Sequence, residues 1–175
     1  MLKIIAKKAL ILVLLVIFLT CYTEAQRKGK TPVTKSGSSA SQIRQVAERV
    51  STQLINVTRF IYVLGGVARE IEQIDQEAKK GNISKTTIER NEEFKRKVIQ
   101  SIGDLRIGLA ILEAEFRSDQ KLNPYSTSLI GIVEDCNLAE EQAMSGQFVQ
   151  AGRTLLTTVE RLANTLVALS SAQIR

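Results

Sequence analysis

The feature that most constrains the fold of this chain is an apolar pattern between residues 42 and 80. Apolar residues at alternating steps of three and four fall on one stripe of an α-helix, and other helices have to cover that stripe. At 1.5 Å per residue, about 39 residues make a helix roughly 60 Å long. The stripe consists of Ile43, Ala47, Val50, Leu54, Val57, Ile61, Leu64, Ala68 and Ile71.

This long helix has recognisable ends and one interruption. Ser39 or Ser41 can cap its first N–H groups, and residues 79–81, Lys-Lys-Gly, place cations and a glycine at its end. Residues 54–68 are apolar on most faces, which predicts burial by more than one neighbouring helix. The glycine pair at 65–66 indicates close packing of a neighbour, a mild kink or a functional hinge.

Three more helices are expected. The second starts after Asn82, with Thr86 and Glu89 spaced as a capping box, and stops at residues 118–123. Pro124 suits the first position of the third helix, which Gly146 closes. A fourth helix is expected from residue 148 to near 175. The apolar stripe of the second helix is Phe94, Val98, Ile102, Leu105, Leu109, Leu112 and Phe116, and that of the third is Leu129, Ile132, Val133, Cys136, Ala139 and Ala143. The stripe of the fourth is Phe148, Ala151, Leu155, Val159, Leu162, Leu166 and Leu169.

Short connections force neighbouring helices to run antiparallel. The chain is therefore predicted to be all-α, an antiparallel up-down four-helix bundle with a long first hairpin, following an N-terminal signal segment. Expected helix lengths of about 39, 34, 22 and 27 residues let the first hairpin extend past the second by roughly 15 to 25 Å. This overhang is expected at residues 73–93, where the sequence becomes polar.

The first 40 residues have the layout of an export signal followed by a linker. Residues 1–25 combine three lysines, an apolar run and a polar end. The run of about 11 residues is shorter than the roughly 20 that a permanent transmembrane helix needs. We expect a cleaved signal peptide, with an uncleaved anchor or a lipoprotein at Cys21 as alternatives. Residues 26–40 are expected to be a disordered basic linker, and residues 41–175 to form the helical bundle domain.

The formal net charge of +6 belongs to the N-terminal segments rather than to the helical domain. From residue 41 onward, 17 Lys and Arg balance 17 Asp and Glu. A nucleic-acid-binding domain requires a basic face on its folded body. Nucleic acid is therefore not an expected partner.

The residue types that are present exclude most catalytic and metal-binding arrangements. The chain has no histidine, which removes His-based nucleophile systems and the His-containing metal sites of helix bundles. Glu134 and Glu141 share one helix face, which we interpret as solvated, with a weak divalent-cation site as the alternative. We expect no catalytic, cofactor or metal site, and we do not expect an enzyme.

Removal of the signal would leave Cys136 as the single cysteine, so no internal disulfide could form. Because Cys136 lies on an apolar stripe, we expect a small buried residue, with a reactive or intermolecular thiol as the alternative. Asn56 and Asn82 fit the glycosylation sequon, which matters only in a eukaryotic host. Asn82, in a turn, is the accessible one of the two.

Two classes of function fit this sequence. The first is an exported, periplasmic or extracellular, non-enzymatic bundle that acts through contacts with an unidentified protein partner, as an adaptor, assembly subunit or sensor-like module. The second is a carrier that binds a small apolar ligand in the bundle near Phe60, Tyr62 and Phe94. In either case the membrane is contacted only through the signal segment, transiently or, if the signal is retained, permanently.

The first prediction concerns export. The exported protein should begin at Gln26, because Thr23 and Ala25 supply small residues at the third and first positions before that cut. Intact-mass measurement of the protein recovered from the extracytoplasmic fraction checks this. A mass that retains residues 1–25 supports the anchor instead, and a lipid on Cys21 supports the lipoprotein.

Overall fold

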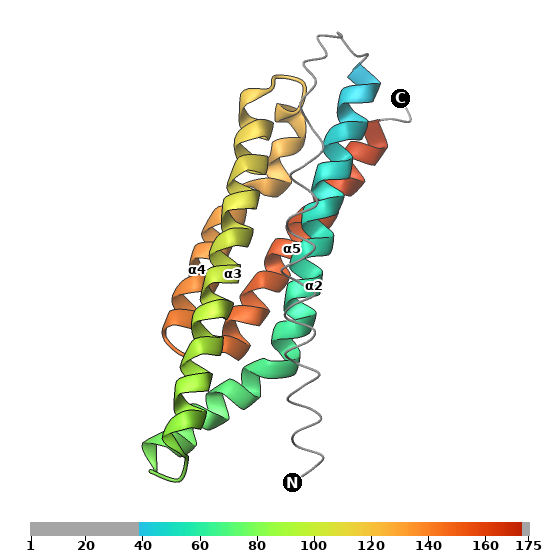
Figure 1. Cartoon of the computed structure of the whole chain (residues 1–175). Coiled ribbons are helices and arrows are strands. Elements are labelled where there is room, and N and C mark those ends of the chain that lie inside the picture. Colours follow the sequence, from blue (N-terminus) through green and yellow to red (C-terminus); the bar gives the residue numbers. More distant parts are fainter. Residues whose placement is uncertain (1–38, 173–175) are drawn as a thin grey trace, which may run out of the picture. The chain divides into compact units, whose positions relative to one another are not determined.

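The computed structural model describes residues 39–172, which belong to one compact unit spanning Gly37–Arg175. The expected signal peptide and linker lie outside the described residues. All regular elements of the described part are helices (Figure 1). They are α2 (Ser39–Lys79), α3 (Lys85–Ser118), the short 3-10 helix η1 (Asn123–Leu129), α4 (Ile132–Met144) and α5 (Phe148–Ala172).

The four α-helices form an antiparallel bundle. Each helix packs on the two that lie beside it: α2 on α3 and α5, and α4 on α3 and α5. Consecutive helices run in opposite directions, with η1 and α4 together returning along α3 (Figure 1). This arrangement confirms the predicted all-α up-down four-helix bundle.

The first hairpin extends beyond the second, as predicted. The N-terminus of α5 lies beside Glu72, whose carboxylate accepts a hydrogen bond from the Val149 N–H at 2.8 Å. The last turns of α2 and the first turns of α3 therefore continue past the end of α5 (Figure 1). We call residues 73–93 the tip. Gly81, at φ +77°, ends α2 in the left-handed conformation, with the Asn82 N–H bonded to the Glu77 carbonyl at 3.2 Å.

Figure 1 shows α2 bending before it enters the tip. The bend follows the pair Gly65 and Gly66, both of which are exposed. Apart from the adjacent residues and the nearby backbone of α2 itself, no atom of the described residues lies within 4 Å of the position that a Cβ would take at either glycine. Close packing of a neighbour is therefore not the reason for this pair, and glycine pairs are among the sites at which helices kink.

The core is built from one stripe of each helix. On α2, five residues of the predicted stripe are buried, whereas Leu54 and Ile61 are only partly covered. As predicted, more than one helix covers this segment, since α2 packs on both α3 and α5, but Ile55 and Tyr62 are exposed. The reason is that α2 has only two neighbours, which leaves its outer face open. The buried residues of α2 are Val46, Val50, Val57, Phe60, Leu64, Ala68 and Ile71.

Two threonines occupy core positions of α5. Thr158 and Thr165 are fully buried, whereas Val159 and Leu166, which the sequence placed on the stripe, are only partly buried. Thr165 Oγ1 donates to the Arg161 carbonyl at 2.8 Å, so its hydroxyl is satisfied inside the helix. A prediction from apolar spacing places the more hydrophobic neighbours of these threonines, Val159 and Leu166, in the core instead. The buried stripe of α5 is Phe148, Ala151, Leu155, Thr158, Leu162, Thr165 and Leu169.

The structure has two elements, η1 and α4, where a single third helix was expected. Pro124 is the second residue of η1, one position later than predicted, and the helical structure is interrupted at Gly131, whose φ is +88°. Arg161 of α5 stabilises the break, since it donates to the Ile130 carbonyl at 2.5 Å and to the Asp135 carboxylate at 2.6 Å. The break therefore depends on a distant side chain that a local pattern does not include.

The expected capping box at the start of α3 is also wrong. Ser84 is the N-cap, with an extended backbone at φ −65° and ψ 147°, and its Oγ accepts the Thr87 N–H at 3.3 Å. Thr86 already lies inside the helix. The helix begins earlier because the turn after Gly81 brings Ser84 into the capping position.

The second prediction tests the core. Leu109→Asp should unfold the bundle, because Leu109 is fully buried and an unpaired charge there costs several kcal/mol against a total stability of about 5–15 kcal/mol. Leu54→Asp should cost less, since Leu54 is only partly buried. Ile111→Asp is the matched control, because Ile111 is 67% exposed on the same helix. Circular dichroism melts measure all three, and equal melts for Leu109→Asp and Ile111→Asp would contradict the assigned core.

Candidate functional site

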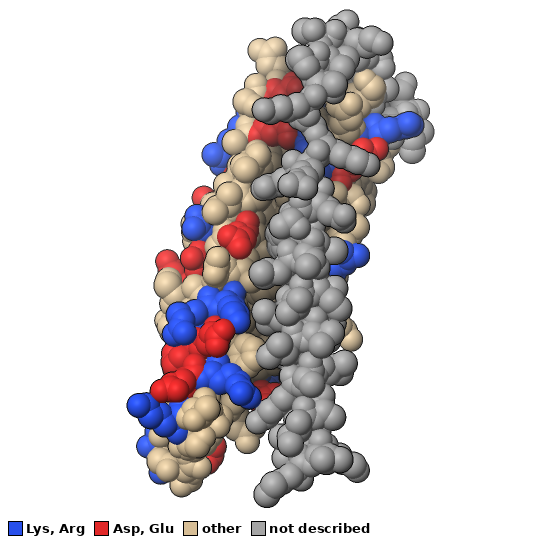
Figure 2. Space-filling view, in the orientation of Figure 1, with Lys and Arg blue, Asp and Glu red and all other residues tan. Residues whose placement is uncertain are grey.

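The tip is held together by ion pairs. Lys95, just beyond it on α3, lies 3.0 Å from Asp75 Oδ2 and 2.5 Å from Glu92 Oε1. Lys80 pairs with Glu77 at 2.9 Å in the turn. Figure 2 shows Lys and Arg interspersed with Asp and Glu over this end of the molecule. The surface that the tip presents is thus charged in both signs.

Burial of Lys95 alone would lower its pKa, but hydrogen bonds to Glu92 and Asp75 outweigh that effect and raise the pKa. In the opposite sense, the hydrogen bond from Lys80 lowers the pKa of Glu77. Both shifts favour the charged forms. The tip therefore keeps these charges over the neutral pH range.

Asn91 is the only buried residue of the tip, all of which is described. Its Nδ2 donates to the Ile71 carbonyl at 3.2 Å and to Asp75 Oδ1 at 2.7 Å, which ties α3 to α2. Its Oδ1 has no hydrogen-bond partner among the described residues. A buried amide between two helices costs stability and favours the one register in which it is hydrogen-bonded.

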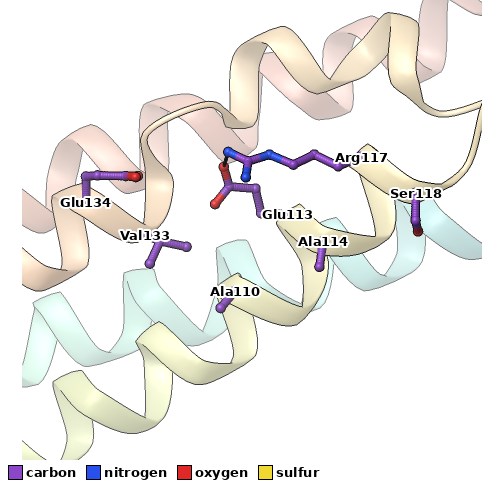
Figure 3. Close-up of a pocket in the computed structure, with 7 residues that line it drawn as sticks. All are labelled: Ala110, Glu113, Ala114, Arg117, Ser118, Val133 and Glu134. Atoms are coloured by element: carbon purple, nitrogen blue, oxygen red, sulfur yellow. Dashed lines mark hydrogen bonds and ion pairs between the residues drawn. The ribbon is translucent and has the colours of Figure 1, made fainter.

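A groove lies between α3 and α4, on the side of the bundle away from α2 (Figure 3). It has a volume of about 500 Å³ and is lined on α3 by Ala110, Ala114 and the ion pair of Glu113 with Arg117 at 2.6 Å. Val133, with Glu134 beside it, forms the α4 wall. Small apolar side chains thus lie next to the Glu134 carboxylate, and Ser118, which also lines the groove, donates its hydroxyl to the Glu115 carbonyl at 3.2 Å.

The three aromatic residues considered for a carrier do not come together. Phe60 is buried in the core and Phe94 is half-buried near the tip, where α3 meets α2 around Ile71 and Asp75. Tyr62 is 84% exposed on the outer face of α2 and cannot line an internal cavity.

Cys136 has the properties of a core residue. It is fully buried, and its Sγ lies 3.8 Å from Thr158 Oγ1. Burial raises the pKa of the thiol to about 11, although the hydrogen bond with Thr158 opposes the shift. A protonated, inaccessible thiol is a poor nucleophile.

The described residues bring no three His, Cys, Asp or Glu side chains together as a metal site. Glu134 and Glu141 are both exposed on α4. In the same part of the chain, no helix combines the length and apolar character needed to cross a membrane. Of the two sequons, Asn82 is exposed in the turn of the tip and Asn56 is half-buried.

Sequence reasoning missed three residues with structural roles. Glu72 caps α5 from another helix, Asn91 bridges two helices, and Arg161 stabilises the break before α4. Each acts over a long sequence separation. None of the three has a local signal in the sequence, and Asn91 lies in the polar stretch 73–93.

Comparisons of this chain with protein families, with curated proteins and with solved structures found no match.

The third prediction concerns Cys136. The native thiol should resist alkylation by iodoacetamide at pH 8 and become reactive only on unfolding, because it is buried and its pKa is about 11. The unfolded thiol ionises near its ordinary pKa while the native one stays protonated, so this residue lowers stability as pH rises from about 9 to about 11.

Urea melts of the protein and of Cys136→Ala across that pH range measure the effect. The parent should lose more stability than Cys136→Ala as the pH rises. Rapid stoichiometric labelling of the native protein at pH 8 would contradict the assigned burial.

Proposed function

We propose that this protein is an exported, non-enzymatic helical bundle that acts through protein contacts, with the tip of its first hairpin as the docking surface. The observation that carries the proposal is that α2 and α3 continue past α5 into a tip with a single buried residue. A segment that contributes so little to the core is free to serve recognition. Export rests on the layout of residues 1–25.

The chemistry of the tip indicates the kind of partner. Its exposed residues include Lys85, Glu89 and Arg90. The side chains of Glu77 and Lys80 also stay partly accessible to solvent, although they form an ion pair. Such a mixed surface suits a polar partner with complementary charges of both signs, whose contacts are hydrogen-bonded and hydrated. The polar link between Asn91 and Asp75 and the cap by Glu72 hold the tip in a defined direction.

The carrier of an apolar ligand remains the alternative. It has less support because Phe60, Tyr62 and Phe94 face different surroundings. Crosslinking of the exported fraction followed by capture would identify a protein partner, whereas a carrier would be recovered with a small molecule.

The fourth prediction separates the two functions. Residues 77–87 are replaced by a short Gly-Asn-Gly-Ser turn, which keeps Asp75 as the partner of Asn91 and Lys95. The melt should change little, because the removed residues bury little apolar surface, and capture of the partner should be lost. A carrier would keep its ligand, since that site lies deeper in the bundle.

A matched pair of point variants controls for this deletion. Arg90→Glu reverses an exposed charge on the tip, and Arg153→Glu reverses an exposed charge on α5, with neither arginine in an ion pair of the described structure. Only the first should weaken capture. If the shortened protein unfolds, the tip belongs to the core; if it folds and captures every partner, the tip is not the docking surface.

A further inference from the structure

A second surface, independent of the tip, lies on the outer faces of α2 and α3. On α2, Ile55 and Tyr62 are 45% and 84% exposed, and Gly66 next to them leaves open space. On α3, Ile107 and Ile111 are 55% and 67% exposed. Large apolar side chains at consecutive turns of an outer face have no role in the core and are typical of interaction surfaces.

The two faces have the same spacing of side chains. Each carries four exposed residues at successive steps of three, four and three along the helix. An equal spacing lets two helices pack side by side with their residues in register. We call the two sets the α2 stripe, which is Arg59, Tyr62, Gly66 and Arg69, and the α3 stripe, which is Asp104, Ile107, Ile111 and Ala114.

Their charges are opposite and uncompensated. Arg59 and Arg69 form no ion pair among the described residues, and neither do Asp104 and Glu134. Arg59 and Arg69 lie on either side of Gly66 along α2. Glu134 and Ala114 both line the groove, Glu134 on its α4 wall beside Val133 (Figure 3).

We propose that the α2 stripe of one copy of this chain binds the α3 stripe of a second copy. In either relative direction of the two helices, one arginine meets Asp104 and the other meets Ala114, at the edge of the groove that Glu134 lines. Gly66 then faces one isoleucine and Tyr62 the other, so that a small residue receives a large one. The cation of Arg117 in the groove is already paired with Glu113.

Because the two stripes differ, this contact is heterologous. An assembly of any length therefore keeps one unoccupied α2 stripe at one end and one unoccupied α3 stripe at the other. A single pair of helices buries less area than a standard interface. The association is therefore weak and depends on concentration. Tyr62 and the arginines are the residue types that contribute most to such contacts.

Sedimentation velocity of the exported protein tests this contact. Between about 10 and about 500 µM the weight-average mass should at least double, as for a weak self-association. Tyr62→Ala and Ile111→Ala should each keep the protein monomeric over that range. Val167→Ala is the matched control, since Val167 is 66% exposed on the outer face of α5, and it should leave self-association unchanged.

Charge reversal identifies the partner stripe. The double variants R59E/R69E and D104R/E134R should each remain monomeric, with unchanged circular dichroism melts because all four residues are exposed. An equimolar mixture of the two should associate again. A parent protein that stays monomeric at the highest concentration overturns the proposal. The proposal is also overturned if Tyr62→Ala stays monomeric while D104R/E134R still associates. That result would mean that α2 pairs with itself.

Discussion

The constraint on which the rest of this structure depends is that each helix of an antiparallel four-helix ring has only two neighbours. Only one stripe per helix can then be buried, and apolar burial of these stripes is the main source of stability in the described part. The single cysteine of that part is buried and free, so no covalent link assists the packing. The same constraint leaves Tyr62, Ile107 and Ile111 outside the core, although the segment around Tyr62 is apolar on most faces.

Packing of stripes specifies a bundle but not its details, and polar side chains decide these. Glu72 caps the N-terminus of α5, Arg161 holds the break before α4 through the Ile130 carbonyl, and Asn91 joins α3 to the carbonyl of Ile71. The first two bonds satisfy backbone groups at a helix end and at a break, and the third adds a hydrogen bond to a carbonyl within α2. These bonds join elements far apart in sequence, and they set where the first hairpin leaves the bundle.

The molecule consequently presents two surfaces of different character. The tip is charged, ion-paired and nearly without a core, with Asn91 as its one buried residue. The outer stripes of α2 and α3 are apolar with one sign of charge each, which suits helix packing. A bundle that associates laterally through its sides and recognises a partner through its end would use both surfaces at once, because they do not overlap.

The sequence by itself determined the fold class, the overhanging hairpin and the glycine stops at Gly81 and Gly146, because helical periodicity and left-handed caps are local properties. It also marked Leu109 and Cys136 as core residues. Only the tertiary structure decided that Thr158 is buried in place of Val159 and that Gly131 splits the third helix. It likewise decided that Tyr62 faces outward. Periodicity reports which side of a helix is apolar, whereas burial depends on how many neighbours that side meets and on side chains from distant segments.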